Sequence, residues 1–116
     1  MFTELRIKDE TYKLRLNTRG SVALEKALGR SPLDILMKFD EGQMPTLTDI
    51  IIILHAMLQP MNHGMSIERV YDLYDAYVAD GHHLFDLIPV IVEVFQESGY
   101  LAKPSEGNIE ADVEKN

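Results

Sequence analysis

The chain has 116 residues, no cysteine, and 19 acidic against 11 basic side chains, which gives a formal net charge of −8. This length suits one domain with a modest core, the lack of cysteine excludes disulfides and thiolate metal sites, and the charge disfavours phosphate backbones and anionic membranes. The longest apolar run, residues 50–54, is far shorter than the roughly 20 residues that a membrane-spanning helix needs. We therefore expect a soluble domain that binds neither nucleic acid nor membrane.

The N-terminal segment has the pattern of a β-hairpin. Two short runs carry apolar side chains at about every second position, and the polar residues 8–11 separate them as a turn. The apolar members are Phe2, Leu5, Ile7, Tyr12, Leu14 and Leu16. An isolated hairpin is marginally stable in water, so we expect this apolar face to pack on the helices that follow.

Two capped helices follow the hairpin. Asn17 can cap the first helix with its side-chain oxygen, with Thr18 and Ser21 as alternative caps. Gly29 supplies the left-handed residue that ends the helix. Ser31 and Pro32 give the second helix a capping hydroxyl and a proline at its first position, which predicts a helix over residues 31–39. The expected inward residues are Ala23, Leu24, Ala27 and Leu28 on the first helix and Leu33, Leu36, Met37 and Phe39 on the second.

A third helix is predicted around four consecutive isoleucines, residues 50–53. Such a run favours a strand, because β-branched residues pack well in sheets. The apolar pattern nevertheless continues at helical spacing through Met57 and Leu58, with a capping Thr46 before it and Pro60 after it. We therefore predict a helix that is apolar on nearly all sides and lies at the centre of the domain.

Two further helices complete the predicted fold. Ser66 caps a fourth helix, which Gly81 terminates, and a last helix covers residues 84–97. Pro89 lies inside the last helix, so the regular helix either begins within a turn of Pro89 or kinks there. The expected inward residues are Ile67, Val70, Tyr71, Tyr74, Tyr77 and Val78 on the fourth helix, and Ile88, Val92 and Phe95, with Ile91 at the edge, on the last.

Together these elements predict an α+β domain that is mostly α-helical, with an N-terminal β-hairpin followed by about five helices. The single domain is expected to cover residues 1–102. Residues 103–116 are polar and acidic, which is typical of a disordered C-terminal tail.

A protein-interaction site is predicted from tyrosine and methionine. Tyr71, Tyr74 and Tyr77 recur at three-residue steps, and tyrosine suits an interface where one end is buried and the other is wet. Met61 and Met65 lie in the loop before that helix, and methionine adapts to changing partners. The alternative for both groups is packing in the core, with the tyrosine hydroxyls reaching solvent.

No pattern points to catalysis. The four histidines, His55, His63, His82 and His83, could bind a divalent metal with nearby carboxylates, which keeps a metal-dependent hydrolase as an alternative. They lack the His-x3-His or Glu-x-x-His spacing that brings ligands onto one helix face, so surface and capping roles are favoured. We therefore predict a protein that is not an enzyme, with no catalytic residue, cofactor or metal site.

A small DNA-binding regulator is the other alternative. Residues 18–38 have the approximate lengths of a helix-turn-helix pair, with residues 31–39 as the recognition helix. A recognition helix needs cations and amides at its N-terminus, whereas this one begins with Ser31, Pro32, Leu33 and Asp34. The net charge of −8 further disfavours DNA.

Two segments carry a family resemblance. LRLNTR at 14–19, followed by LEKALGRSPL at 24–33, resembles the N-terminal signature of the tail assembly chaperones of long-tailed phages and prophages of Gram-positive bacteria. VFQESGY at 94–100 is similar to the last helix of that family and its exit. The resemblance covers residues 2–101, and its motif contains no catalytic residue.

The resemblance implies a factor of the host bacterial cytoplasm that acts during virion assembly and is absent from the mature virion. Such chaperones hold the tape measure protein until tail tube subunits polymerise around it. A programmed frameshift often adds an extension that recruits the tail tube protein, and the terminal residues Glu114, Lys115 and Asn116 permit a slippery codon sequence. A chaperone that lines a filament can also form a homo-oligomer.

Overall fold

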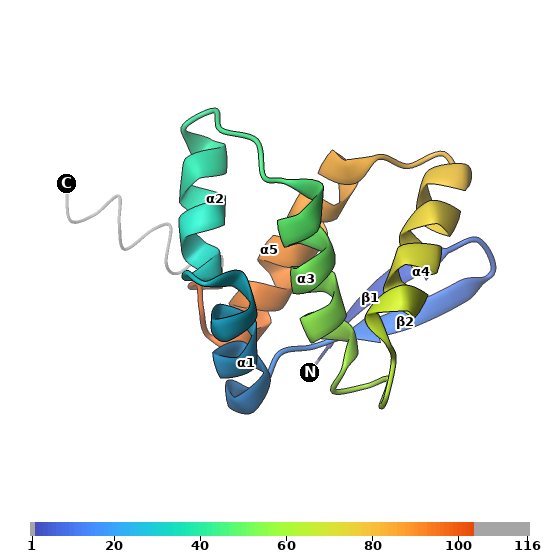
Figure 1. Ribbon diagram of the computed structural model, residues 1–116, viewed down its shortest axis with the longest axis horizontal. Coiled ribbons are helices and arrows are strands. Elements are labelled where there is room, and N and C mark those ends of the chain that lie inside the picture. Colours follow the sequence, from blue (N-terminus) through green and yellow to red (C-terminus); the bar gives the residue numbers. More distant parts are fainter. Residues whose placement is uncertain (1, 104–116) are drawn as a thin grey trace.

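The computed structural model describes residues 2–103, drawn in colour in Figure 1. The elements are β1 (Thr3–Ile7), β2 (Glu10–Leu14), α1 (Thr18–Leu28), α2 (Pro32–Asp40), α3 (Leu47–Leu58), α4 (Ile67–Ala79), the 3-10 turn η1 (Leu84–Asp86) and α5 (Leu87–Ser98). The predicted α+β fold, mostly helical with an N-terminal hairpin and five helices, is confirmed. The predicted disordered tail lies outside the described residues except for Lys103.

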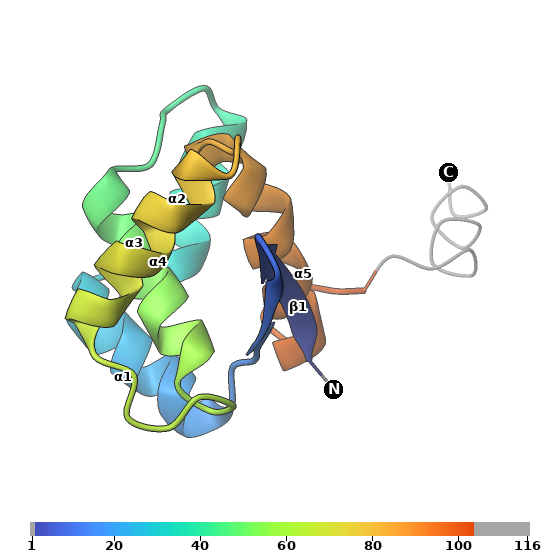
Figure 2. The same ribbon diagram turned by 90° about the vertical axis from the view of Figure 1, so that its right-hand side faces the viewer.

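The structure has two layers, and α3 belongs to one of them and contacts the other (Figure 2). In Figure 2, α1, α3 and α4 lie on one side, and the hairpin and α5 lie on the other. Helix α3 contacts α1, α4, β2 and α5, while β1 contacts both α4 and α5. The predicted central position of α3 is therefore confirmed, and the four isoleucines form a helix because their burial on several sides outweighs their preference for strands.

The hairpin covers the core with alternate side chains of β1. The two strands pair antiparallel, and Thr3, Leu5 and Ile7 are buried, with exposed residues between them. Phe2 was expected on this face, but it is exposed. Alternate residues of a strand share a face, so Thr3 lies on the buried side with Leu5 and Ile7, and Phe2 lies on the opposite side. A backbone hydrogen bond of 2.8 Å from the N–H of Arg15 to the carbonyl of Met57 joins the end of the hairpin to α3.

Helices α3 and α5 supply most of the core. Their buried side chains are Ile50, Ile51, Ile53, Leu54, Met57 and Leu58 of α3, and Leu87, Ile88, Ile91, Val94 and Phe95 of α5. Burial of each large apolar side chain contributes about 1.5–3 kcal/mol. These two helices are therefore the main source of stability.

The inward faces of α1 and α2 differ from the prediction. On α1 only Leu24 is fully buried, and both Ala23 and Ala27 are exposed. On α2, Ile35 is buried while Met37 is 63% exposed. Both helices lie at the border of the domain, so each needs only a narrow buried stripe, and the remaining apolar side chains stay in contact with solvent.

Pro89 lies at the start of the last helix and not in its middle. Helix α5 begins at Leu87, after η1, so Pro89 occupies its first turn. An N–H in the first turn has no partner within the helix, and a proline there causes no kink. Ile91 lies in the core rather than at its edge, and Val92 is only partly buried because Val94 takes the inward position.

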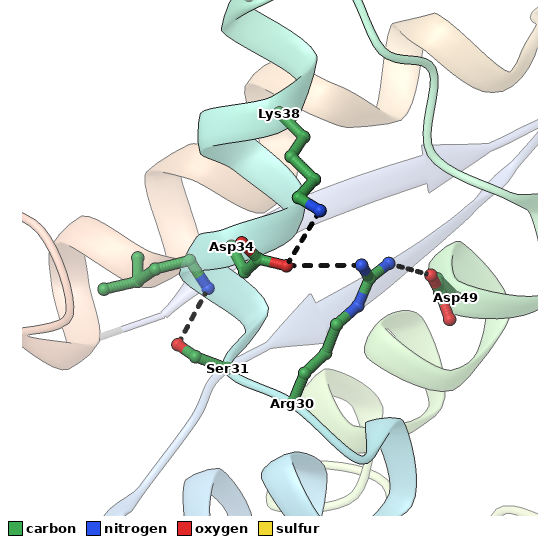
Figure 3. A network of polar contacts seen from close by, with 6 residues as sticks. Arg30, Ser31, Asp34, Lys38 and Asp49 are labelled. Atoms are coloured by element: carbon green, nitrogen blue, oxygen red, sulfur yellow. Dashed lines mark hydrogen bonds and ion pairs between the residues drawn. The ribbon is translucent and has the colours of Figure 1, made fainter.

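The predicted caps are confirmed, and one of them lies beside an ion-pair network (Figure 3). Ser31 Oγ accepts a hydrogen bond of 3.2 Å from the backbone N–H of Leu33. Next to it, Arg30 Nη1 lies 3.2 Å from Asp34, and Arg30 Nη2 lies 2.7 Å from Asp49. Arg30 therefore joins the end of α1 and the start of α2 to the first turn of α3.

We expect Ser31→Ala to lower the free energy of unfolding by about 1 kcal/mol, because the N–H of Leu33 then loses its partner. Urea unfolding followed by circular dichroism measures this change. Ser31→Asp is the matched control, since aspartate is an equally good cap and should keep most of the stability. Equal stability of the alanine variant and the parent would contradict the assigned role of Ser31.

Candidate functional site

The outward side of α3, between α1 and α4, carries two open grooves. In Figure 1, α3 lies between these two helices and in front of α5. The first groove separates α1 from α3, and the second separates α3 from α4. We call the surface that contains both grooves the α1–α3–α4 face.

The first groove has a volume of about 480 Å³. Small side chains create it: Gly20, Ala23 and Ala27 on α1 lie opposite Ile52 and Ala56 on α3. Because none of these alanines reaches across the gap, an open trough remains between the two helices, and the buried Leu24 lines it. The trough is mainly apolar.

Polar residues at one end of the first groove hold the α3–α4 loop. His55 Nε2 lies 3.0 Å from the carbonyl oxygen of Met65, and Gln59 Nε2 donates a hydrogen bond of 2.7 Å to the same oxygen. The contact requires the His55 tautomer that carries its proton on Nε2. His55 therefore positions the loop, while His63 is an exposed residue of the groove rim.

The second groove has a volume of about 380 Å³. It is lined by Leu47, Thr48, Ile51, Ile52, Ile67, Tyr71, Tyr74 and Asp75. Ile52 lines both grooves, so the two form one apolar strip with Ile52 at its centre. An amphipathic helix laid on such a strip would place its apolar side chains in the two grooves.

The three tyrosines of the predicted interaction site lie in two different environments. Tyr71 is 48% exposed, and Tyr74 is partly buried; both line the second groove. Tyr77 is 4% exposed and stacks on His82 with the ring centroids 4.4 Å apart, so for this residue the structure fits the alternative of packing in the core. Tyr77 follows Tyr71 by six residues, so the two side chains point about 120° apart around the axis of α4. Tyr71 therefore faces the groove while Tyr77 points into the core.

The two methionines predicted for the site lie in the α3–α4 loop. Met61 is exposed, and Met65 packs partly buried against the core. Neither is among the residues that line the two grooves. The residues that the sequence prediction missed are Ala23, Ala27, Ile52 and Ala56. Ala23 and Ala27 recur on α1 at helical spacing, which predicts an inward stripe, and their small size was the signal for the groove; nothing comparable distinguishes Ile52 and Ala56 within α3.

The four histidines are not brought together. His82 and His83 both contact Asp86, at 3.2 and 3.4 Å, while His55 and His63 lie beside the first groove. The backbone N–H of His83 donates to Asp86, and this hydrogen bond, assisted by the two imidazoles, lowers the pKa of the Asp86 carboxyl. Within residues 2–103, no group of three or more His, Cys, Asp or Glu is placed to hold a metal ion.

Helix α2 lacks free cations for the DNA-binding alternative. Arg30 and Lys38 both approach Asp34, at 3.2 and 3.9 Å, and Arg30 also pairs with Asp49. The exposed side of α2 includes Met37 instead of a set of amides and cations. In the part of the chain that the structure describes, no helix is long and apolar enough to cross a membrane.

Three tyrosines with raised pKa values should make the fold less stable in alkali. Burial raises the pKa of Tyr12, Tyr77 and Tyr100 above the ordinary value of 10.0, and hydrogen bonds to Glu10 and Glu25 raise it further for the first and third. A raised pKa in the folded state stabilises the fold below the unfolded pKa, and this stabilisation disappears as the pH rises through the folded value.

We therefore expect the free energy of unfolding to fall above a pH of about 10. Urea unfolding from pH of about 8 to about 11, with phenolate absorbance recorded in parallel, measures the decline. In Tyr100→Phe the decline should be shallower, because one of the three phenols is gone. An identical decline in this variant would contradict the assignment.

Comparison with known proteins supplies a family. No curated protein and no solved structure matches the chain. A family model described as "Family of unknown function (DUF6096)" matches residues 3–116, which take in nearly all of the described domain and continue to the last residue. The chain therefore belongs to the DUF6096 family.

Proposed function

We propose that this protein is a tail assembly chaperone of long-tailed phages or prophages of Gram-positive bacteria. It holds the tape measure protein in the host cytoplasm until tail tube subunits polymerise around it, and it is absent from the mature virion. The observation that carries the proposal is the α1–α3–α4 face, which offers two apolar grooves on a domain of net charge −8.

The physical requirements of a holding factor support this role. Such a factor must cover apolar helical segments of a partner, and grooves of about 480 and 380 Å³ can receive large apolar side chains. It must also stay soluble while it exposes that surface, and a net charge of −8 opposes self-aggregation. Neither requirement calls for a reactive group.

The segments that resemble the chaperone family have a scaffolding role in the fold. Leu24 is the buried contact of α1, Gly29 ends α1 with φ of 74°, and Ser31 caps α2. Leu24 also lines the first groove, while Gly29 and Ser31 set the turn between α1 and α2. In the proposal, a frameshifted product adds an extension after the terminal residues, and this extension recruits the tail tube protein.

Co-expression tests the proposal. The tape measure protein encoded by the same genome should be insoluble when it is expressed alone, and it should be soluble and co-purify when it is expressed with this chain. The neighbouring DNA gives a second test, since an overlapping frame and then a very long open reading frame should follow the gene. A tape measure protein that stays insoluble and unbound in the presence of this chain, or a metabolic gene neighbourhood, would overturn the proposal.

A further inference from the structure

We propose that the α1–α3–α4 face binds an amphipathic helix with a particular charge pattern: acidic residues along one flank of its apolar stripe and basic residues along the other. The inference rests on the proposed function and specifies the kind of partner segment that this face takes. It is carried by the charges on the two opposite rims of the face.

The rim on α1 is positive. Arg19 lines the first groove, and together with Lys26 it also lines a shallow hollow on the outer side of α1. No acidic residue lines the groove or the hollow, as far as residues 2–103 are described. Glu25, the acid of α1, lies on another side of the helix, where it accepts a hydrogen bond of 3.0 Å from Tyr100 Oη.

The rim on α4 is negative. Asp75 lines the second groove, and Glu68 is exposed two helical turns before it on the same side of α4. Arg69, the cation of α4, is directed to the hairpin, where its Nη2 lies 3.4 Å from Tyr12 Oη. The positive charge of Arg69 therefore does not neutralise the rim.

The rim charges are available to a partner. Among the described residues, Arg19 and Lys26 have no acidic partner within 4.0 Å, and Glu68 and Asp75 have no basic one. The cation at the end of α1, Arg30, differs from them because it is already paired with Asp34 and Asp49. Two unpaired rims of opposite sign are thus separated by an apolar strip.

A helix lying on the strip meets both rims at once. Its apolar stripe contacts Ile52, and the small residues Thr48 and Ala56 on either side allow its backbone to approach α3 closely. Acidic residues on the flank near α1 and basic residues on the flank near α4 would then pair with the rims. Reversing the direction of a helix exchanges its flanks, so the charge pattern also fixes the direction in which the partner lies.

Four synthetic helices of about 21 residues, long enough to be helical in isolation, test the inference. All carry the same leucine stripe, and their flanks are acidic and basic, both acidic, both basic, or both glutamine. At low salt, fluorescence anisotropy should give a Kd for the mixed-flank helix about fivefold to tenfold below those of the others, and the advantage should vanish at about 0.5 M salt.

Variants of the protein supply the matched control. Arg19→Glu combined with Lys26→Glu makes both rims negative, and its preference should move to the helix with two basic flanks by a similar factor. Arg19→Lys keeps the charge and should leave the order of affinities unchanged. A spin label at the N-terminus of the mixed-flank helix should broaden NMR signals at one end of α3, and exchanging the flanks should move the broadening to the other end.

The outcomes separate this inference from the proposed function. Equal affinities for all four helices, or tightest binding of the all-basic helix by the parent protein, would overturn the proposed charge pattern. Either result would still agree with a helix-binding role for the α1–α3–α4 face. A dimer found by sedimentation, with the second copy bound at this face, would also overturn the proposed charge pattern. If no helix binds, the inference fails, and co-expression with the tape measure protein decides separately whether the proposed function stands.

Discussion

Replacing Phe95 by alanine is expected to lower the free energy of unfolding by about 3–5 kcal/mol. Phe95 is 0% exposed in α5, and its ring lies 5.3 Å from that of Tyr100, measured between centroids. Truncation would leave a cavity and remove the contact that anchors the chain after α5. Since domains of this size have total stabilities of about 5–15 kcal/mol, the variant should be partly unfolded at moderate temperature.

Phe85→Ala is the matched control for this experiment. Phe85 is 46% exposed in η1, so its truncation exposes little new surface and should cost less than about 1 kcal/mol. Urea unfolding of both variants, followed by circular dichroism, gives the comparison. Similar losses in the two variants would contradict the assignment of Phe95 to the centre of the core.

Ile52→Asp should strongly weaken binding at the α1–α3–α4 face and leave the fold intact. Ile52 lines both grooves, so a carboxylate there would be desolvated by an apolar partner without a hydrogen-bond donor to compensate. We expect the affinity for the partner helix to fall by at least about thirtyfold, equivalent to about 2 kcal/mol. Co-purification of the tape measure protein should be lost as well.

Met37→Asp serves as the control for binding, because Met37 is 63% exposed on α2 and lies outside both grooves. This variant should bind as the parent does. Ile53→Asp serves as the control for folding, since Ile53 is buried one position away and its replacement should unfold the domain. If Ile52→Asp is folded and still binds the partner, the face is not the binding site.

The ends of the helices could be predicted because their signals are local. Asn17, Ser31, Thr46 and Ser66 each accept a hydrogen bond from a backbone N–H one turn or less away. Such a bond depends on a few consecutive residues and not on the rest of the fold. For the same reason, the left-handed conformation of Gly29 at the end of α1 was predictable.

The faces of the helices were less predictable because they depend on distant partners. Ile52 stands in a run of four isoleucines, and nothing in the run distinguishes it from Ile51 or Ile53, yet both of these are buried while Ile52 contributes to both grooves. In the same way, Ala27 is apolar at helical spacing but faces the open groove. An apolar period indicates a helix without specifying which side another helix covers.

The ion pair of Arg30 with Asp49 affects how a partner helix would bind the first groove. It joins the turn that follows α1 to the first turn of α3, so the two helices cannot move apart at that end of the first groove without separating the two charges. A partner helix would therefore bind a groove whose width is restrained at one end before binding, and the conformational entropy lost on association would fall mainly on the incoming chain. Segments that are helical before they arrive should be captured most tightly.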